Sequence, residues 1–191
     1  MVVGVALLLA LVFGAADQYL GSLSAHPWAV EVSLLSAPWL VLPFVAGLTQ
    51  RAARRGALLG LACTAAALLG YGLMTLSPVE NAHLTLQTAS GFARSQRLVL
   101  GGAVTGPLFG WWGSRWRTDR AFVGALVTAC ALCLEPIAHK LAPSRVGGVF
   151  LGQPIDVREV WLAEVVLGLA FAAYFAAQLI RARRDVAGVA R

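Results

Sequence analysis

Four acidic residues of this sequence lie inside apolar stretches, where carboxyl groups are rare. Glu135 and His139 are four positions apart in the run ALCLEPIAHK, so a helix places both on one face. Glu164 follows Trp161 by three positions and shares a face with it in the same way. A charged side chain at the centre of a membrane costs about 3 kcal/mol unless it is paired or hydrated. These positions therefore indicate a site for a general acid, a proton relay or a cation.

The four acids are predicted to lie at a similar depth. Asp17 lies about six residues before the end of the first apolar run, and Glu31 about four after the start of the second. Glu135 and Glu164 occupy the matching positions of the fifth and sixth runs, roughly 6–9 Å below the outer surface. Close carboxylates disfavour each other's charged form, so such a layer retains a proton at neutral pH. For any single acid, pairing with an outer basic side chain such as Lys140 is an equally good interpretation.

The elements that position these residues are membrane helices. Of 191 residues, 59% are apolar and 13% charged, whereas a soluble domain has about 25% charged residues. We expect one all-α integral membrane domain over residues 1–191, a polytopic bundle of six transmembrane helices. The predicted spans are Val3–Leu23, Trp28–Leu48, Gly56–Leu76, Leu98–Trp112, Ala121–Leu141 and Val160–Ile180. The fourth is rich in glycine and is expected to be tilted, broken or closely packed.

The positive charge predicts the orientation. Residues 49–55, residues 113–120 and the tail from Arg181 together hold ten of the fifteen Lys and Arg residues. The positive-inside rule then places both termini in the cytoplasm and the connections 77–97 and 142–159 outside a cell membrane crossed several times. Since the net charge of +6 lies in these short connections, it is an orientation signal and does not indicate a nucleic-acid partner.

Aromatic side chains are expected around the acids. The predicted substrate-binding residues are Gln18, Trp28, Trp39, Tyr71 and Trp161. Trp39 and Tyr71 lie deep enough for their rings to stabilise a cation. Trp28 and Trp161 fit an interfacial aromatic belt at least as well, and Trp111, Trp112 and Trp116 are assigned to the belt at the cytoplasmic end.

No metal or cofactor is predicted. The three histidines are scattered, and the sequence has neither an HExxH motif nor a DxxxD pair in a span. Cys130 and Cys133 have the spacing of a metal or redox motif, but they lie at lipid depth and are interpreted as small apolar residues.

Three segments give the chain a family likeness: AADQYLG at 15–21, SAPWLVLPFVAG at 36–47 and GYGLMTLSPVE at 70–80. They resemble an uncharacterised actinobacterial six-span integral membrane family, over most of the chain. More loosely, a small bundle with buried acids and aromatic residues resembles the membrane-bound terpene cyclases of drimentine-type and meroterpenoid secondary metabolism. That likeness implies a lyase or isomerase reaction in which a carboxylic acid protonates a prenylated substrate and a cation closes the ring.

The first functional hypothesis is a cofactor-independent membrane enzyme acting on a lipophilic, prenylated substrate. Glu135 or Asp17 is the expected proton donor, with Glu31 and Glu164 as partner carboxylates or terminating bases and His139 orienting Glu135.

The alternative is a transporter of a small solute or ion, or the membrane-embedded substrate-binding subunit of one. A third hypothesis is a structural or assembly partner without chemistry. In each case the expected partners are membrane lipid and, for the first hypothesis, a lipophilic small molecule.

Overall fold

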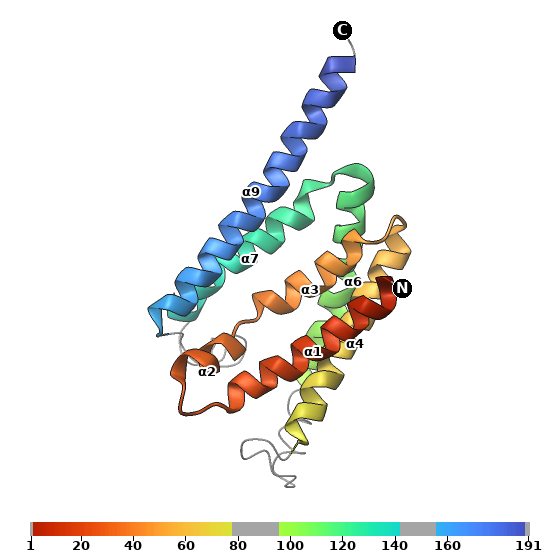
Figure 1. The fold of residues 1–191 in the computed structure, drawn as a ribbon. Coiled ribbons are helices and arrows are strands. Elements are labelled where there is room, and N and C mark those ends of the chain that lie inside the picture. The colour runs from red at the N-terminus through yellow and green to blue at the C-terminus, as the bar shows by residue number, and fades with distance from the viewer. Residues whose placement is uncertain (1, 78–95, 142–155, 190–191) are drawn as a thin grey trace.

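The computed structural model describes residues 2–77, 96–141 and 156–189, and every regular element in these ranges is an α-helix. The all-helical prediction is therefore confirmed. The helices are α1 (Val2–Ser22), α2 (Pro27–Ser33), α3 (Ala37–Leu48), α4 (Ala53–Thr75), α6 (Gln96–Asp119), α7 (Phe122–Leu141) and α9 (Arg158–Val189), as Figure 1 shows. The two predicted outer connections lie almost entirely outside the described residues.

Four helices, α1, α4, α7 and α9, are long and apolar enough to cross a membrane, and α2 with α3 makes a fifth if the bent pair is one span. This fits a membrane protein. α6 has 24 residues, but its glycines, its tryptophans and its charged last turn lower its mean hydropathy. A sixth span and the cytoplasmic location of both termini stay predictions.

The second predicted span, Trp28–Leu48, is divided in the structure. α2 ends at Ser33, α3 begins at Ala37, and the two helices are bent by 52°. Pro38 explains the position of the break. Its ring would clash with the carbonyl of Leu34, four residues earlier, and it has no N–H to donate there. The same residue suits the first turn of a new helix, where its missing N–H has no partner in any case.

Glycines bring α4 and α6 into close backbone contact. A methyl group added at Gly60 would meet the carbonyl oxygen of Gly106, and one added at Gly110 would meet that of Gly56. Gly47 of α3 packs on Gly110 in the same way. Small residues at such spacing let helices approach closely in a membrane. The glycine-rich fourth run is therefore closely packed, and it forms one uninterrupted helix.

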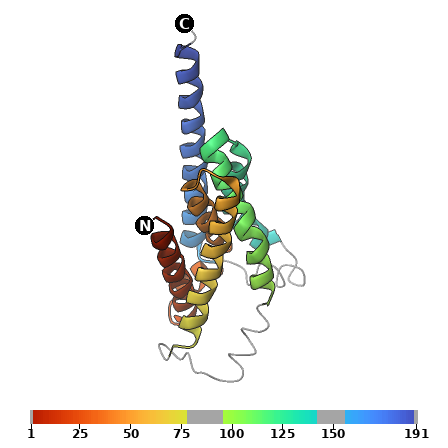
Figure 2. The same ribbon diagram turned by 90° about the vertical axis from the view of Figure 1, so that its right-hand side faces the viewer.

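Aromatic rings join α9 to the rest of the bundle. The Phe175 ring lies 4.8 Å from the Trp116 ring and 5.6 Å from the Phe44 ring, centroid to centroid. Trp116 is only 3% exposed, so it belongs to the core rather than to the interfacial belt assigned from sequence. Beyond this cluster α9 extends past the other helices (Figure 2). Its 32 residues correspond to about 48 Å.

Candidate functional site

The break between α2 and α3 leaves the first backbone N–H groups of α3 without helical partners, and a glutamate from another helix accepts them. Glu135 of α7 receives the Ser36 N–H on Oε1 at 2.5 Å and the Ala37 N–H on Oε2 at 2.7 Å. The Ser36 side chain makes no capping bond of its own. Because a helix N-terminus is positively polarised, it favours a carboxylate in this place. Glu135, a residue of α7, therefore caps the N-terminus of α3.

His139 lies one turn further along α7, as the sequence spacing predicts. Its Nε2 is 3.5 Å from Oε1 of Glu135, and both side chains are almost fully buried. A protonated imidazole at this distance would balance the carboxylate charge, whereas a neutral imidazole would not.

Glu164 brings a second carboxyl group to the same place from α9. It is 2% exposed, and its carboxyl group interacts directly with that of Glu135. In the described part of the chain, neither carboxylate oxygen of Glu164 accepts a hydrogen bond from an N–H group. The two carboxyl groups thus have opposite surroundings. Glu135 accepts backbone donors, whereas Glu164 lies against Glu135 and accepts no N–H group in the described ranges. Glu135, His139 and Glu164 are called the glutamate cluster below.

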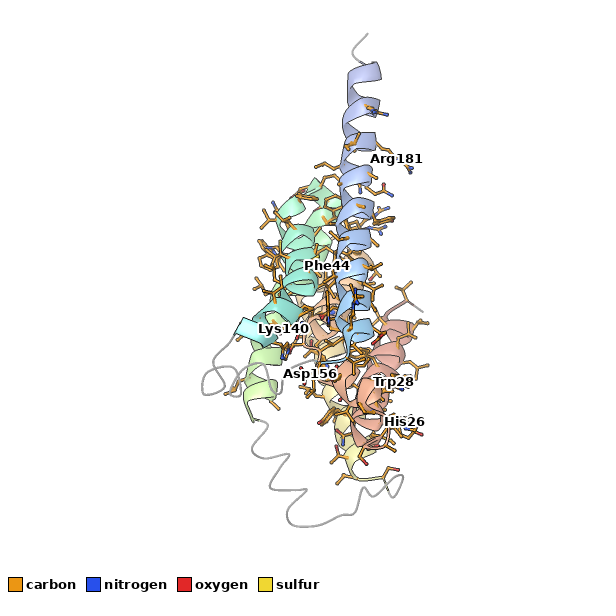
Figure 3. All side chains as sticks on the ribbon, turned by 90° about the vertical axis from the view of Figure 1, so that its left-hand side faces the viewer. His26, Trp28, Phe44, Lys140, Asp156 and Arg181 are labelled. Atoms are coloured by element: carbon orange, nitrogen blue, oxygen red, sulfur yellow. The ribbon has the colours of Figure 1, made fainter. Side chains whose placement is uncertain are left out.

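Glu31 caps a different helix. Its Oε1 accepts the Asp156 N–H at 3.0 Å and its Oε2 accepts the Val157 N–H at 2.7 Å, immediately before α9 begins. It is half-buried. Its contacts explain the residue structurally, as an acceptor at the positive end of α9. Asp156 and Lys140 lie toward the end of the molecule opposite to Arg181 (Figure 3).

Asp17 forms a third group, away from α7 and α9. It is 9% exposed and forms a hydrogen bond with the Trp39 side chain. Tyr71 of α4 lies close enough to interact electrostatically with Asp17. The Trp39 ring lies 5.4 Å from that of Phe13 and 6.4 Å from that of Tyr71. Asp17 is therefore enclosed by aromatic rings from three helices.

The other predicted substrate-binding residues have separate surroundings. Trp28 is 51% exposed and packs edge-on against His26, which fits an interfacial position. The Trp161 ring lies 4.9 Å from Nζ of Lys140, in a cation–π contact. Gln18 is half-buried beside Asp17 in sequence. Of the five residues, Trp39 and Tyr71 are the two for which the described part of the chain shows an interaction with an acid.

The residues that the sequence did not single out are Ser36 and Ala37, which act through their backbone N–H groups. The signal was present in the next residue, because a proline inside an apolar run marks the point where backbone donors are released. Among the described residues, no group of three or more His, Cys, Asp and Glu side chains is arranged to hold a metal ion.

Comparisons with known proteins add nothing to these contacts. No protein-family model, no curated protein and no solved structure matches the chain.

Proposed function

We propose that this protein is a membrane transporter that couples the movement of a small solute to protons, with the glutamate cluster as its proton site. The observation on which the proposal depends is the cap of a broken span by Glu135, with the buried Glu164 against it. Broken helices at membrane depth are characteristic of solute and ion sites in transporters, since their free ends are polar.

The two glutamates suit one shared proton. Two adjacent carboxylates in a medium of low dielectric repel each other strongly, so the pair is stable when one of them is neutral. The charge of Glu135 is matched by two N–H groups and by the end of α3. Glu164 has no such donors, so it is the member that holds the proton, and its O–H can donate to Glu135.

A second proton would then open the cluster. A protonated Glu135 is a weaker acceptor for Ser36 and Ala37, and it no longer benefits from the positive end of α3. The two N–H groups become available to an acceptor on the solute, such as a carboxylate or a carbonyl oxygen. Binding of a proton and binding of the solute are linked in this scheme because both displace the same cap.

Proton movement in proteoliposomes tests this function. A pH-sensitive dye inside the vesicles reports protons that enter when small carboxylic acids and amides are added outside, one compound at a time. We expect at least one compound to drive acidification with the native protein, and Glu135→Gln and Glu164→Gln to abolish it. Glu159→Gln is the matched control, because Glu159 is an exposed residue on the same helix as Glu164. Failure of every compound, or full coupling in Glu164→Gln, would contradict the proposal.

A second candidate function rests on the surroundings of Asp17. A buried carboxylic acid enclosed by Phe13, Trp39 and Tyr71 suits the protonation of an alkene in a prenylated substrate, after which the aromatic faces stabilise the cation until it loses a proton. Cells that make prenylated precursors would then accumulate an isomer of unchanged mass, detected by mass spectrometry of lipid extracts. Asp17→Asn should remove that isomer and Glu159→Gln should not. Identical extracts with and without the native protein would exclude this function for those precursors.

A further inference from the structure

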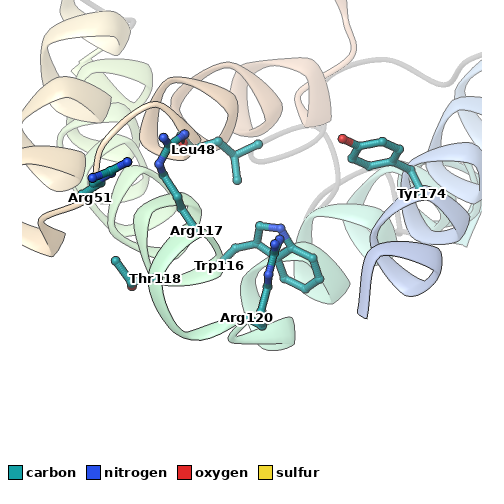
Figure 4. A pocket seen from close by; sticks show the side chains of 7 residues that line it. All are labelled: Leu48, Arg51, Trp116, Arg117, Thr118, Arg120 and Tyr174. Atoms are coloured by element: carbon teal, nitrogen blue, oxygen red, sulfur yellow. Dashed lines mark hydrogen bonds between the residues drawn. The ribbon is translucent and has the colours of Figure 1, made fainter. Parts of the chain in front are cut away.

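A pocket of about 580 Å³ opens at the other end of α3, away from the glutamate cluster. It lies between the C-terminal ends of α3 and α6 and the middle of α9. Its lining consists of Leu48, Arg51, Trp116, Arg117, Thr118, Arg120 and Tyr174 (Figure 4). Three of these are arginines and none of them is acidic.

The arginines are positioned by their own contacts. Nη1 of Arg117 donates to the Leu48 carbonyl at 3.1 Å. This bond uses one of the five donors of a guanidinium group. The Arg120 guanidinium stacks on the Trp116 ring, 5.7 Å from its centroid. Arg120 has a φ of 54°, a left-handed conformation that is uncommon for a residue other than glycine. It forms the turn between α6 and α7, where its N–H donates to the Trp116 carbonyl at 3.1 Å.

Asp119, the acidic residue next to Arg120 in the chain, forms its ion pair outside the pocket lining. Its Oδ2 lies 2.6 Å from Nη2 of Arg115, which is not a lining residue. The charge of the three lining arginines is therefore matched by no carboxylate within the described lining. A concave, mixed polar and aromatic site with forked donors suits an anion with several oxygens, above all phosphate.

We propose that this pocket binds a phosphate-bearing anion. Two sources have this chemistry, the headgroup of an anionic phospholipid and a free phosphate. The positive-inside rule predicts that this end of the bundle faces the cytoplasm, where basic pockets between membrane helices hold lipid headgroups. The proposal is independent of the function of the glutamate cluster.

Binding to two probes distinguishes the sources. Native mass spectrometry of the protein released from nanodiscs measures retained phosphatidylglycerol against phosphatidylcholine, and calorimetric titration in detergent measures inorganic phosphate. The pocket variant replaces Arg51, Arg117 and Arg120 with Gln. Its control replaces Arg54, Arg55 and Arg181, three exposed residues outside the lining, with Gln, so that both variants lose the same charge.

We expect the pocket variant to lose affinity about tenfold or more, the effect of about one charge-assisted hydrogen bond, and the control to lose little. A preference for phosphatidylglycerol that follows this pattern supports the lipid source. Affinity for inorganic phosphate without that preference supports the free anion. Arg51→Gln alone, in the connection between α3 and α4, should give an intermediate loss and leaves the contacts of Arg117 and Arg120 in place. Equal losses in both triple variants, or binding of neither probe by the native protein, would overturn the proposal.

Discussion

Glu135 and Glu164 are two residues of one type in contact, and they differ in what their oxygens meet. The Glu135 oxygens accept two backbone N–H groups, whereas those of Glu164 meet no such donor in the described ranges. A buried polar group without donors is costly, and a buried donor left without its acceptor is costly too. The same substitution should therefore have opposite effects at the two positions.

This contrast can be measured with methionine, which has a volume close to that of glutamate and no charge. Glu135→Met leaves the Ser36 and Ala37 N–H groups without acceptors, and we expect a loss of about 2–4 kcal/mol in the free energy of unfolding. Glu164→Met removes a buried carboxyl group that accepts no N–H in the described ranges, together with its hydrogen bond to Glu135, and should be neutral or stabilising by about 1 kcal/mol. Thermal and denaturant unfolding in detergent micelles compares them. A larger loss for Glu164→Met than for Glu135→Met would contradict this difference between the two carboxyl groups.

At the scale of helices, caps from neighbouring helices fix where α3 and α9 begin. Glu31 holds the two N–H groups just before α9, as Glu135 does for α3. Loss of a cap usually costs about 0.5–2 kcal/mol and acts first on the end of the helix. The effect of removing Glu31 should therefore be local.

Glu31→Ala is expected to speed amide hydrogen exchange at residues 156–160 while the middle of α9 stays protected. The physical reason is that the Asp156 and Val157 N–H groups lose their acceptor, so that the first turn opens more often. Hydrogen–deuterium exchange with mass spectrometry checks this. Glu159→Ala, in the same turn, should change the exchange much less, and uniform acceleration along α9 would argue against a local cap.

Two glycine-to-alanine substitutions on α6 test the close packing of α4 and α6. A methyl group at Gly110 meets the Gly56 carbonyl, whereas one at Gly101 meets no atom within 4 Å. Gly110→Ala should therefore destabilise the protein by about 1–3 kcal/mol. Gly101→Ala should be neutral or stabilising by up to about 1 kcal/mol, since alanine favours a helix. The midpoint of thermal unfolding of Gly110→Ala should fall below that of the native protein and that of Gly101→Ala should not, and equal midpoints would contradict the packing.

The positions of the helices along the chain could largely be predicted from the sequence, because the length of an apolar run determines where a membrane helix can lie. All six predicted runs coincide with helical segments. The division of the second run was missed because hydropathy does not register the N–H that Pro38 lacks. The acids are predicted at one depth, and the sequence leaves open whether they face one another. In the structure Asp17 packs with aromatic rings and Glu31 caps α9. Depth follows from counting residues, whereas the rotation of each helix depends on packing partners far away in the sequence.

For the whole molecule, the charges divide the bundle into two ends. The arginine pocket lies where α3 and α6 end, and the glutamate cluster where α3 begins. The predicted orientation places the pocket on the cytoplasmic side and the connection between α1 and α2 outside. This assignment concerns the membrane itself, so contacts within the protein do not decide it.

Cysteine labelling in intact cells decides the orientation. In a variant without the native Cys63, Cys130 and Cys133, a cysteine at Ser24 should react with a membrane-impermeant maleimide, and one at Arg54 should react only after the cells are opened. Both positions are exposed, so access depends on the side of the membrane. The reverse pattern would invert the topology and place the arginine pocket outside.

The two caps also have a consequence for how the protein is made. Glu31, in the first half of the chain, holds the start of α9, and Glu135, in the second half, holds the start of α3. In the predicted membrane topology, the first half of the chain would reach the bilayer while the amides of Ser36 and Ala37 and the carboxylate of Glu31 have none of these partners. The bent pair α2–α3 would then stay near water or beside the insertion machinery, and α3 would take its final place only after α7 enters the membrane.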